Sequence, residues 1–209
     1  MRGTMFLNKR ICQVVGLFLS FAFFYECIGA SIDHATITEV VNDVKILDPK
    51  SLNASPAKAS GIFRTPQIMQ TGAESRSEMI AADQTITRVG ADTLFSFEPK
   101  ERTINLRQGS ILFQSPTGKG GGVIRTESAT AAVLGTTIIV VATRDGGFKI
   151  LVLEGTAQVT MPNGTKRIVH GGQLVVVTPG AKLAGSFTSP RSSHASLPIA
   201  APRPRNQPC

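Results

Sequence analysis

A succession of short apolar runs, each ended by a glycine-rich turn, occupies residues 106–177 and constrains the possible folds most strongly. The runs are rich in Val, Ile and Thr, which favour the pleated surface of a β-sheet. Turns at Gly135, Asp145-Gly146-Gly147, Gly155, Asn163-Gly164 and Gly171-Gly172 recur at intervals of roughly 8–12 residues, which is typical of sandwiches and barrels. The stretch predicts an all-β, sandwich-like or roll-like domain of many short, mostly antiparallel strands, with no long helix outside the N-terminal leader.

The preceding region carries the same type of pattern. Residues 31–47 contain Ile and Val with polar residues between them, and predict a first hairpin. Residues 76–97 contain three further short runs, and Asn163-Gly164 predicts a tight hairpin turn later in the chain. The side chains expected in the core of these early strands are Ile86, Phe95, Phe97, Ile104 and Leu106.

The charge of the chain argues against nucleic-acid binding. The net charge is +8, and the leader (residues 1–30) contains three of the 22 basic and one of the 14 acidic residues. There is no Trp, and the single Tyr, Tyr25, lies in the leader. Proteins that bind single-stranded nucleic acid combine clustered cations with stacking aromatic rings. We therefore expect no nucleic-acid partner.

The two ends of the chain differ in composition from the region between them. Residues 1–10 are basic, residues 11–25 are apolar and residues 27–30 are mostly small, as in a secretory signal peptide cleaved near Ala30. The alternative is an uncleaved anchor, although the apolar run is shorter than the ~20 residues that span a bilayer. Residues 31–184 then form the β domain, and residues 185–209, rich in Pro, Ser and Arg, form a disordered tail. The expected location is periplasmic or secreted, without a stable membrane span after cleavage.

Few residues offer metal, cofactor or catalytic chemistry. Two of the three cysteines lie in the leader and the third is the last residue, so no disulfide can form within the domain. The three histidines show no metal-ligand spacing. We expect no catalytic, cofactor-binding or metal-binding residues; the cysteines and histidines are Cys12, Cys27, Cys209, His34, His170 and His194.

Two features could still be interpreted as catalytic. Lys119 lies in a glycine-rich segment, residues 116–122, but a phosphate-binding loop needs Ser or Thr after the Lys and a following helix. Asp145 and Glu154 could form a carboxylate pair as in a glycosidase, although both lie at turns. An envelope hydrolase therefore remains a hypothesis, with less support than a non-enzymatic role.

Five segments in order resemble the FecR domain family. The first is TGAESRSE at residues 71–78, followed by Asp83. The others are LRQGSILF at 106–113, AAVLGT at 131–136, LEGTAQV at 153–159 and GGQ at 171–173. They resemble the family's motifs over about residues 67–177. The glycines at 135, 155 and 172 supply turn conformations or close strand approach in this interpretation.

The resemblance implies a periplasmic all-β domain without catalytic residues. The best-known members relay a signal from an outer-membrane receptor to an iron-uptake sigma factor, through a cytoplasmic segment and one membrane span. Only residues 1–10 precede the apolar run here, so we expect an exported domain acting alone. The leading hypothesis is a non-enzymatic protein that binds another envelope component, either a protein or a surface polymer, for example by strand addition. The alternative is a signalling adaptor that regulates a sigma-factor or receptor system through a separate partner chain.

Overall fold

The computed structural model describes residues 34–51, 53–98, 102–178 and 184–188 of the chain. The leader with its cleavage site, Cys12, Cys27, His194 and Cys209 lie outside these residues. The described residues form seventeen β-strands and no helix, which confirms the all-β prediction. None of them belongs to a helix that is long and apolar enough to cross a bilayer.

The strands are mostly four to eight residues long. They are β1 (His34–Val41), β2 (Val44–Leu47), β3 (Ala54–Pro56), β4 (Ile62–Arg64), β5 (Ile68–Thr71), β6 (Arg76–Ala81), β7 (Ile86–Val89), β8 (Leu94–Phe97), β9 (Thr103–Gln114), β10 (Gly122–Arg125), β11 (Thr130–Val133), β12 (Thr137–Ala142), β13 (Phe148–Glu154), β14 (Thr156–Thr160), β15 (Lys166–His170), β16 (Gln173–Val177) and β17 (Ala184–Thr188). Strand β17 spans the boundary that we predicted between the β domain (residues 31–184) and the tail (residues 185–209).

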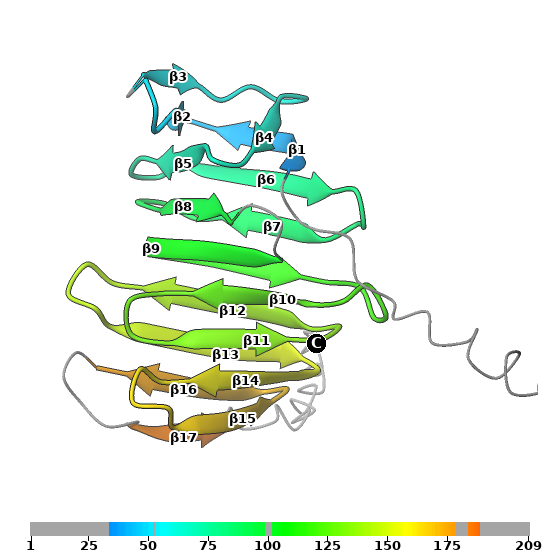
Figure 1. Cartoon of the computed structure of the whole chain (residues 1–209), viewed down its shortest axis with the longest axis vertical. Helices are drawn as coiled ribbons and strands as arrows, with labels where there is room; N and C mark the ends of the chain where they lie inside the picture. The colour runs from blue at the N-terminus through cyan, green and yellow to red at the C-terminus, as the bar shows by residue number, and fades with distance from the viewer. Residues whose placement is uncertain (1–33, 52, 99–101, 179–183, 189–209) are drawn as a thin grey trace, which may run out of the picture.

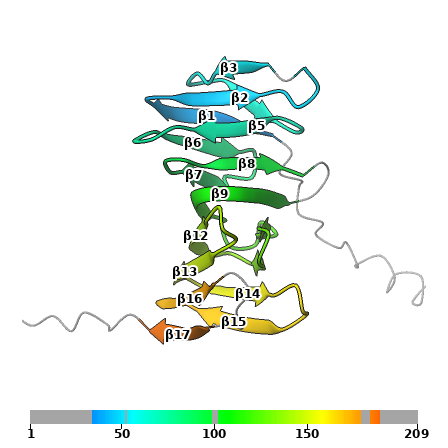
Figure 2. The same cartoon turned by 90° about the vertical axis from the view of Figure 1, so that its left-hand side faces the viewer.

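The strands form two sheets that share β9. Sheet A has the order β4-β1-β6-β7-β9-β12-β13-β16-β17. Sheet B has the order β3-β2-β5-β8-β9-β10-β11-β14-β15. Both orders run from the N-terminal to the C-terminal strands, so the described chain builds one elongated stack (Figures 1 and 2). Only the β9–β10 pair is parallel among the described pairings, which confirms a mostly antiparallel arrangement.

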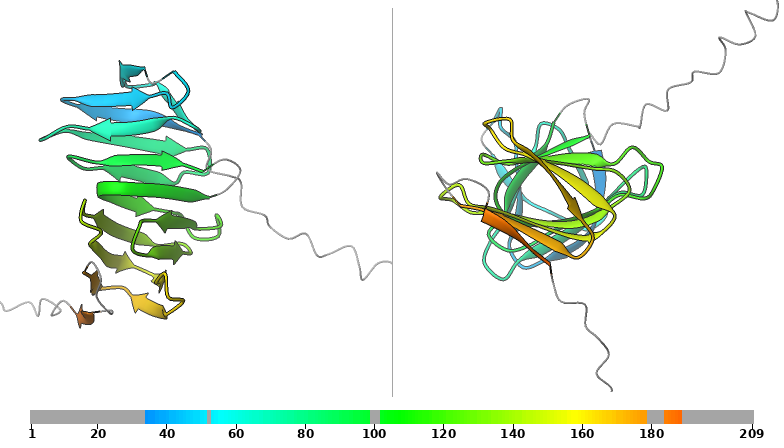
Figure 3. Two further views of the ribbon diagram at one scale, coloured as in Figure 1. Left: turned by 60° about the vertical axis from the view of Figure 1, so that its left-hand side comes forward. Right: turned by 90° about the horizontal axis from the view of Figure 1, so that it is seen from below.

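The chain changes sheet at many of its turns. Strand β1 lies in sheet A, whereas β2 lies in sheet B, where it pairs with β3 and β5. The first hairpin that we predicted for residues 31–47 is therefore wrong: both strands exist, but they do not pair with each other. Seen along the stack, successive strands wind around a common axis (Figure 3). By contrast, β14 and β15 form the hairpin predicted at Asn163-Gly164, with Thr160 opposite Lys166.

Strand β9 joins the two sheets at the middle of the stack. Its first half pairs with β8 and β10 in sheet B, and its second half, from Gly109 onward, pairs with β12 in sheet A. Gly109 has φ +92°, and a Cβ at this position would lie 2.4 Å from the Cα of Thr93. Glycine is required here because other residues adopt this conformation with strain and because the neighbouring chain leaves no space.

The core lies between the two sheets and follows the two-residue period of the strands. Phe63, Phe95 and Phe97 form a ring cluster with centroids 5.2–5.8 Å apart in the N-terminal half. The predicted core residues Phe95, Phe97, Ile104 and Leu106 are all buried. Ile86 is only half-buried, which corrects our expectation, because Thr87 and Val89 occupy the inward positions of β7.

Candidate functional site

The candidate binding surface lies at the C-terminal end of sheet B, whose edge strand is better suited to pairing than the two N-terminal edge strands. Strands β3 and β4 have three residues each, and β3 ends in a proline. Short edge strands and prolines are common devices against strand addition, since they remove part of the ladder of backbone donors and acceptors. Strand β15, at the other end, has five residues and no proline.

Strand β15 pairs over its whole length with β14, from Lys166 to His170. Among the described strands, β14 is its only ladder partner. Ile168 lies at the centre of β15 with 49% of its surface exposed. An open five-residue edge with an exposed aliphatic side chain is a suitable acceptor for a strand from another chain.

A groove with a volume of about 480 Å³ adjoins this edge on the outer face of sheet B. A cross-strand row forms part of its lining: Val123 pairs with Ala132, Ala132 with Gln158, and Gln158 with Ile168. Leu134, which is 76% exposed, and Thr156 complete this part of the groove. A single exposed aliphatic side chain is common, but several that line one groove form an apolar patch of the kind that marks a contact site. The groove therefore extends the candidate surface from the β15 edge across β14 and β11.

The loop of residues 116–122 packs tightly against the end of β11 and provides one side of the groove. Gly121 has φ +65°, and a Cβ there would lie 1.8 Å from the carbonyl oxygen of Val133. Gly135, with φ +59°, also lies close to the loop: a Cβ there would be 2.9 Å from the Cα of Thr117. The glycine-rich segment around Lys119 thus serves close packing and leads into strand β10, not into a helix.

A buried ion pair holds this loop to the middle of the stack. Arg102 Nε donates to the carbonyl oxygen of Gly121 at 2.7 Å, and Arg102 Nη2 donates to Asp83 Oδ2 at 2.6 Å. The two side chains are only 12% and 9% exposed. Asp83 also accepts bonds from the Thr85 amide and hydroxyl at 3.0 and 2.9 Å. A buried charge pair is stable only when its remaining polar atoms are also satisfied, and this one is well satisfied.

The pKa of Asp83 reflects this environment. Burial raises the pKa, but the hydrogen bonds from the Thr85 amide, from Arg102 and from the Thr85 hydroxyl, together with the charge of Arg102, outweigh it. The net result is a pKa below the ordinary value of an aspartic acid. Asp83 is therefore ionised at neutral pH and acts as a structural anchor of the groove.

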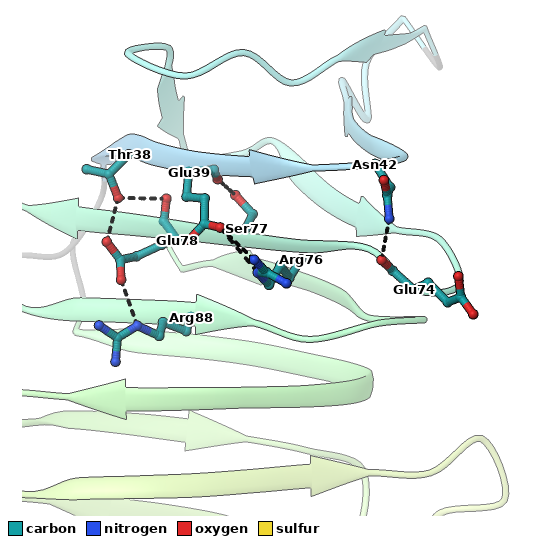
Figure 4. A network of polar contacts seen from close by, with 8 residues as sticks. All are labelled: Thr38, Glu39, Asn42, Glu74, Arg76, Ser77, Glu78 and Arg88. Atoms are coloured by element: carbon teal, nitrogen blue, oxygen red, sulfur yellow. Dashed lines mark hydrogen bonds and ion pairs between the residues drawn. The ribbon is translucent and has the colours of Figure 1, made fainter.

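The outer face of sheet A carries a second polar network, at β1, β6 and β7 (Figure 4). Arg76 pairs with Glu39 at 3.1 Å, and Arg88 pairs with Glu78 at 2.6 Å. The Thr38 hydroxyl donates to Glu78 at 2.9 Å. All of these groups find their partners within the network, so it offers no convergent unpaired group to a ligand.

The residues that could have formed catalytic or metal sites lie apart. Asp145 is in the β12–β13 turn, where it accepts a bond from the Thr143 hydroxyl, and Glu154 is at the opposite end of β13. Seven strand residues separate them by roughly 20 Å, too far for a glycosidase pair. His34 begins β1 and His170 ends β15. Among the described residues, no three His, Cys, Asp or Glu side chains could hold a metal ion together.

The main contributors to this surface were not identified from the sequence as a site. Arg102 only preceded an alternating strand, and Leu134 stood only as part of the AAVLGT segment. Ile168 carried no signal, since an aliphatic residue in a short strand usually faces the core. The one available indication was the position of Leu134 directly before the turn glycine Gly135.

Comparison with known proteins gives a consistent result for the fold. Residues 67–158 match the family described as FecR protein. Two crystal structures, each of a candidate anti-sigma factor from Parabacteroides distasonis, superimpose with a TM-score of 0.52 at 17% and 19% identity. Each match covers 58% of this chain and 59% of the other chain, so the likeness concerns the fold of little more than half of each. No curated protein matches.

The matched family region contains Asp83 and Arg102, loop 116–122 and strand β11, that is, the ion pair and most of the groove. The match begins at residue 67 as expected but ends at residue 158, so the GGQ segment at residues 171–173 lies outside it. The fold agrees with that of the two anti-sigma structures. Residues 67–158 of this chain are therefore similar to the FecR family.

Proposed function

We propose that this protein is an exported, non-enzymatic FecR-domain protein that binds another component of the cell envelope. The observation that supports it most directly is the open β15 edge beside the groove of about 480 Å³. The bound component adds a strand to β15 by main-chain hydrogen bonds and places an apolar side chain against Leu134 and Ile168. The domain family, whose members are regulatory, and the dispersed carboxylates support a non-enzymatic role.

The second candidate function is an adaptor in envelope signalling. Its support is the family and the shared fold with candidate anti-sigma factors. In this version, the bound component is a receptor or a membrane-bound regulator on a separate chain, and the same edge and groove receive it.

Site-specific photo-cross-linking in the native cell tests the proposal. A cross-linker at residue 168 samples the open edge, and one at residue 62 is the matched control. Ile62 is also an aliphatic residue of an edge strand, 51% exposed, but it lies on β4 at the opposite end of the stack. We expect an envelope component to be captured from residue 168 and not from residue 62.

The identity of the captured component separates the two functions. A receptor or an inner-membrane regulator supports the adaptor, whereas a surface polymer or a structural envelope protein supports the first function. Equal capture from both positions, or capture from residue 62 alone, would contradict binding at β15. Hydrolysis of an envelope polymer that is lost in Asp145→Asn or Glu154→Gln would contradict the non-enzymatic role.

A further inference from the structure

We infer that the outer face of sheet A over β9, β12, β13 and β16 docks an amphipathic helix of a partner chain. This surface lies on the other sheet from the β15 edge and the groove. The inference therefore goes beyond the function proposed above and concerns a second contact of the same protein.

The surface, here called the aliphatic face, consists of outward side chains on four adjacent strands: Leu112, Ile139, Val141, Leu151, Leu174 and Val176. Four of them form a continuous cross-strand row. Leu112 pairs with Ile139, Ile139 with Leu151, and Leu151 with Leu174. Directly paired side chains on one face of a sheet lie about 5 Å apart and contact each other.

These strands are apolar on both faces. In β12, Ile138 and Val140 are fully buried in the core, while Ile139 and Val141 between them point outward and stay partly exposed. In β13, Ile150 and Val152 face the core and Leu151 faces outward. Strands of this kind are typical of sheets that are covered on both sides, usually by helices. The outward residues here are accessible to a covering element.

The dimensions of the aliphatic face match a single helix. Four strands and two outward rows cover roughly 19 by 14 Å, or on the order of 300 Å². A helix of about 13 residues spans 19 Å. Its pitch of about 5.4 Å is close to the strand spacing of about 4.8 Å, so each turn can contact one strand of the row.

The charge pattern specifies the partner further. Lys149 lies between Val141 and Val176 in the row beside the leucines and is exposed, and no carboxylate in the described part of the chain pairs with it. The face is bounded on the β7 side by Arg88, which is opposite Leu112 and already paired with Glu78. A helix with an aliphatic stripe at i, i+3, i+4 and i+7, flanked by acidic residues, complements both the row and Lys149.

A designed peptide makes this testable before the natural partner is known. The probe is a 14-residue helical peptide with leucines at the stripe positions and glutamates beside them. The control peptide has the same composition with the leucines distributed around the helix. Methyl NMR spectra of the whole protein are recorded with each peptide. We expect only the striped peptide to shift the methyl signals of Leu112, Ile139, Leu151 and Leu174.

Three variants test the surface. Leu151→Glu places a charge at the centre of the row and should weaken binding by about tenfold or more. Leu153→Glu, at a 43% exposed position on the same strand, is the second variant in case the first fails to fold. Ile168→Glu makes the same kind of change on the exposed edge of sheet B and should leave peptide binding unchanged.

Three results would overturn the inference. The first is equal binding of both peptides, and the second is a shift confined to Leu134 and Ile168. The third is a concentration-dependent dimer, seen by sedimentation, that Leu151→Glu abolishes, since it would assign the face to a second copy. Because Ile168→Glu affects only the β15 surface, failure of the helix site and failure of the proposed function remain distinguishable.

Discussion

The two halves of the outer face of sheet A are built on the same inward pattern and differ in what they present outward. Over β1, β6 and β7, the outward side chains include Thr38, Glu78, Arg76 and Arg88, which pair with each other and with Glu39 (Figure 4). The half-buried Ile80 and Ile86 lie beside this network as one aliphatic pair. Over β9, β12, β13 and β16, the corresponding row continues from Arg88 into Leu112 and then only aliphatic residues. The polar network of the first half is satisfied by its own contacts, and the second half has the more continuous apolar surface. Two parts of the same sheet can therefore differ in whether they offer apolar surface to a partner.

The largest expected effect is the difference in unfolding free energy between replacing an inward residue of β9 and replacing its outward neighbour. Phe113→Ala should lower the free energy of unfolding by about 3–5 kcal/mol, because it leaves a cavity in the core where Phe113 is buried. Leu112→Ala, its outward neighbour, should cost about 1 kcal/mol or less. Urea unfolding of both variants measures the difference. Equal losses would mean that the aliphatic face is itself part of a packed interior, and the comparison would fail.

The buried ion pair should matter far more than the surface pairs. Arg102→Met leaves the Asp83 carboxylate buried without its partner, and we expect a loss of about 3 kcal/mol. The double variant Asp83→Asn with Arg102→Met should recover part of this loss, since no unpaired charge remains. Thermal and urea unfolding test both, and a single variant as stable as the original would show that the pair does not anchor the loop of residues 116–122.

The contribution of Asp83 to the free energy of unfolding should depend on pH in the acid range. Its pKa is lowered in the folded protein, whereas the unfolded value is about 3.9, so its contribution to stability is present above pH ~4. The contribution is lost as the pH falls through the folded pKa. We expect the stability difference between the original protein and Asp83→Asn to shrink as the pH is lowered from about 5 to 2. A difference that stays constant over this range would contradict the lowered pKa.

The smallest expected effect concerns the exposed network. Arg88→Ala removes the pair with Glu78 on the surface of sheet A, and exposed pairs contribute about 0.2–1 kcal/mol. The loss should diminish further in 1 M salt, because the charges are screened. Unfolding at low and high salt measures it. A salt-independent loss above 2 kcal/mol would contradict the view that Arg88 and Glu78 form an ordinary exposed ion pair.

Much of the local structure was predictable. The turns predicted at Gly135, Asp145-Gly146-Gly147, Gly155 and Gly171-Gly172 all lie between consecutive strands from β11 to β16. Phe95, Phe97, Ile104 and Leu106 are in the core as expected. The FecR resemblance, which we expected over about residues 67–177 and which the family match shows over residues 67–158, was also visible, because glycines at fixed turns and alternating apolar residues are local features of the chain.

The errors arose where a local pattern has two equivalent outcomes. The alternation in residues 31–47 is the same whether β1 and β2 pair with each other or enter opposite sheets. Ile86 was assigned to the core, but a shift of one residue in the inward set exchanges the two faces of a strand. In both cases the outcome depends on partners distant in the sequence, such as β6 for β1.

The amino-acid sequence by itself determined that this chain forms short strands with alternating burial, that glycine turns separate them, and that residues 67–158 resemble the FecR family. These features depend on the conformational freedom of single residues and on apolar periodicity, both of which act over a few positions. Only the tertiary structure decided which strands share a sheet, that Arg102 reaches Asp83, and that one half of sheet A remains apolar outside. Those features arise from pairings between distant segments, whose geometry no local pattern specifies.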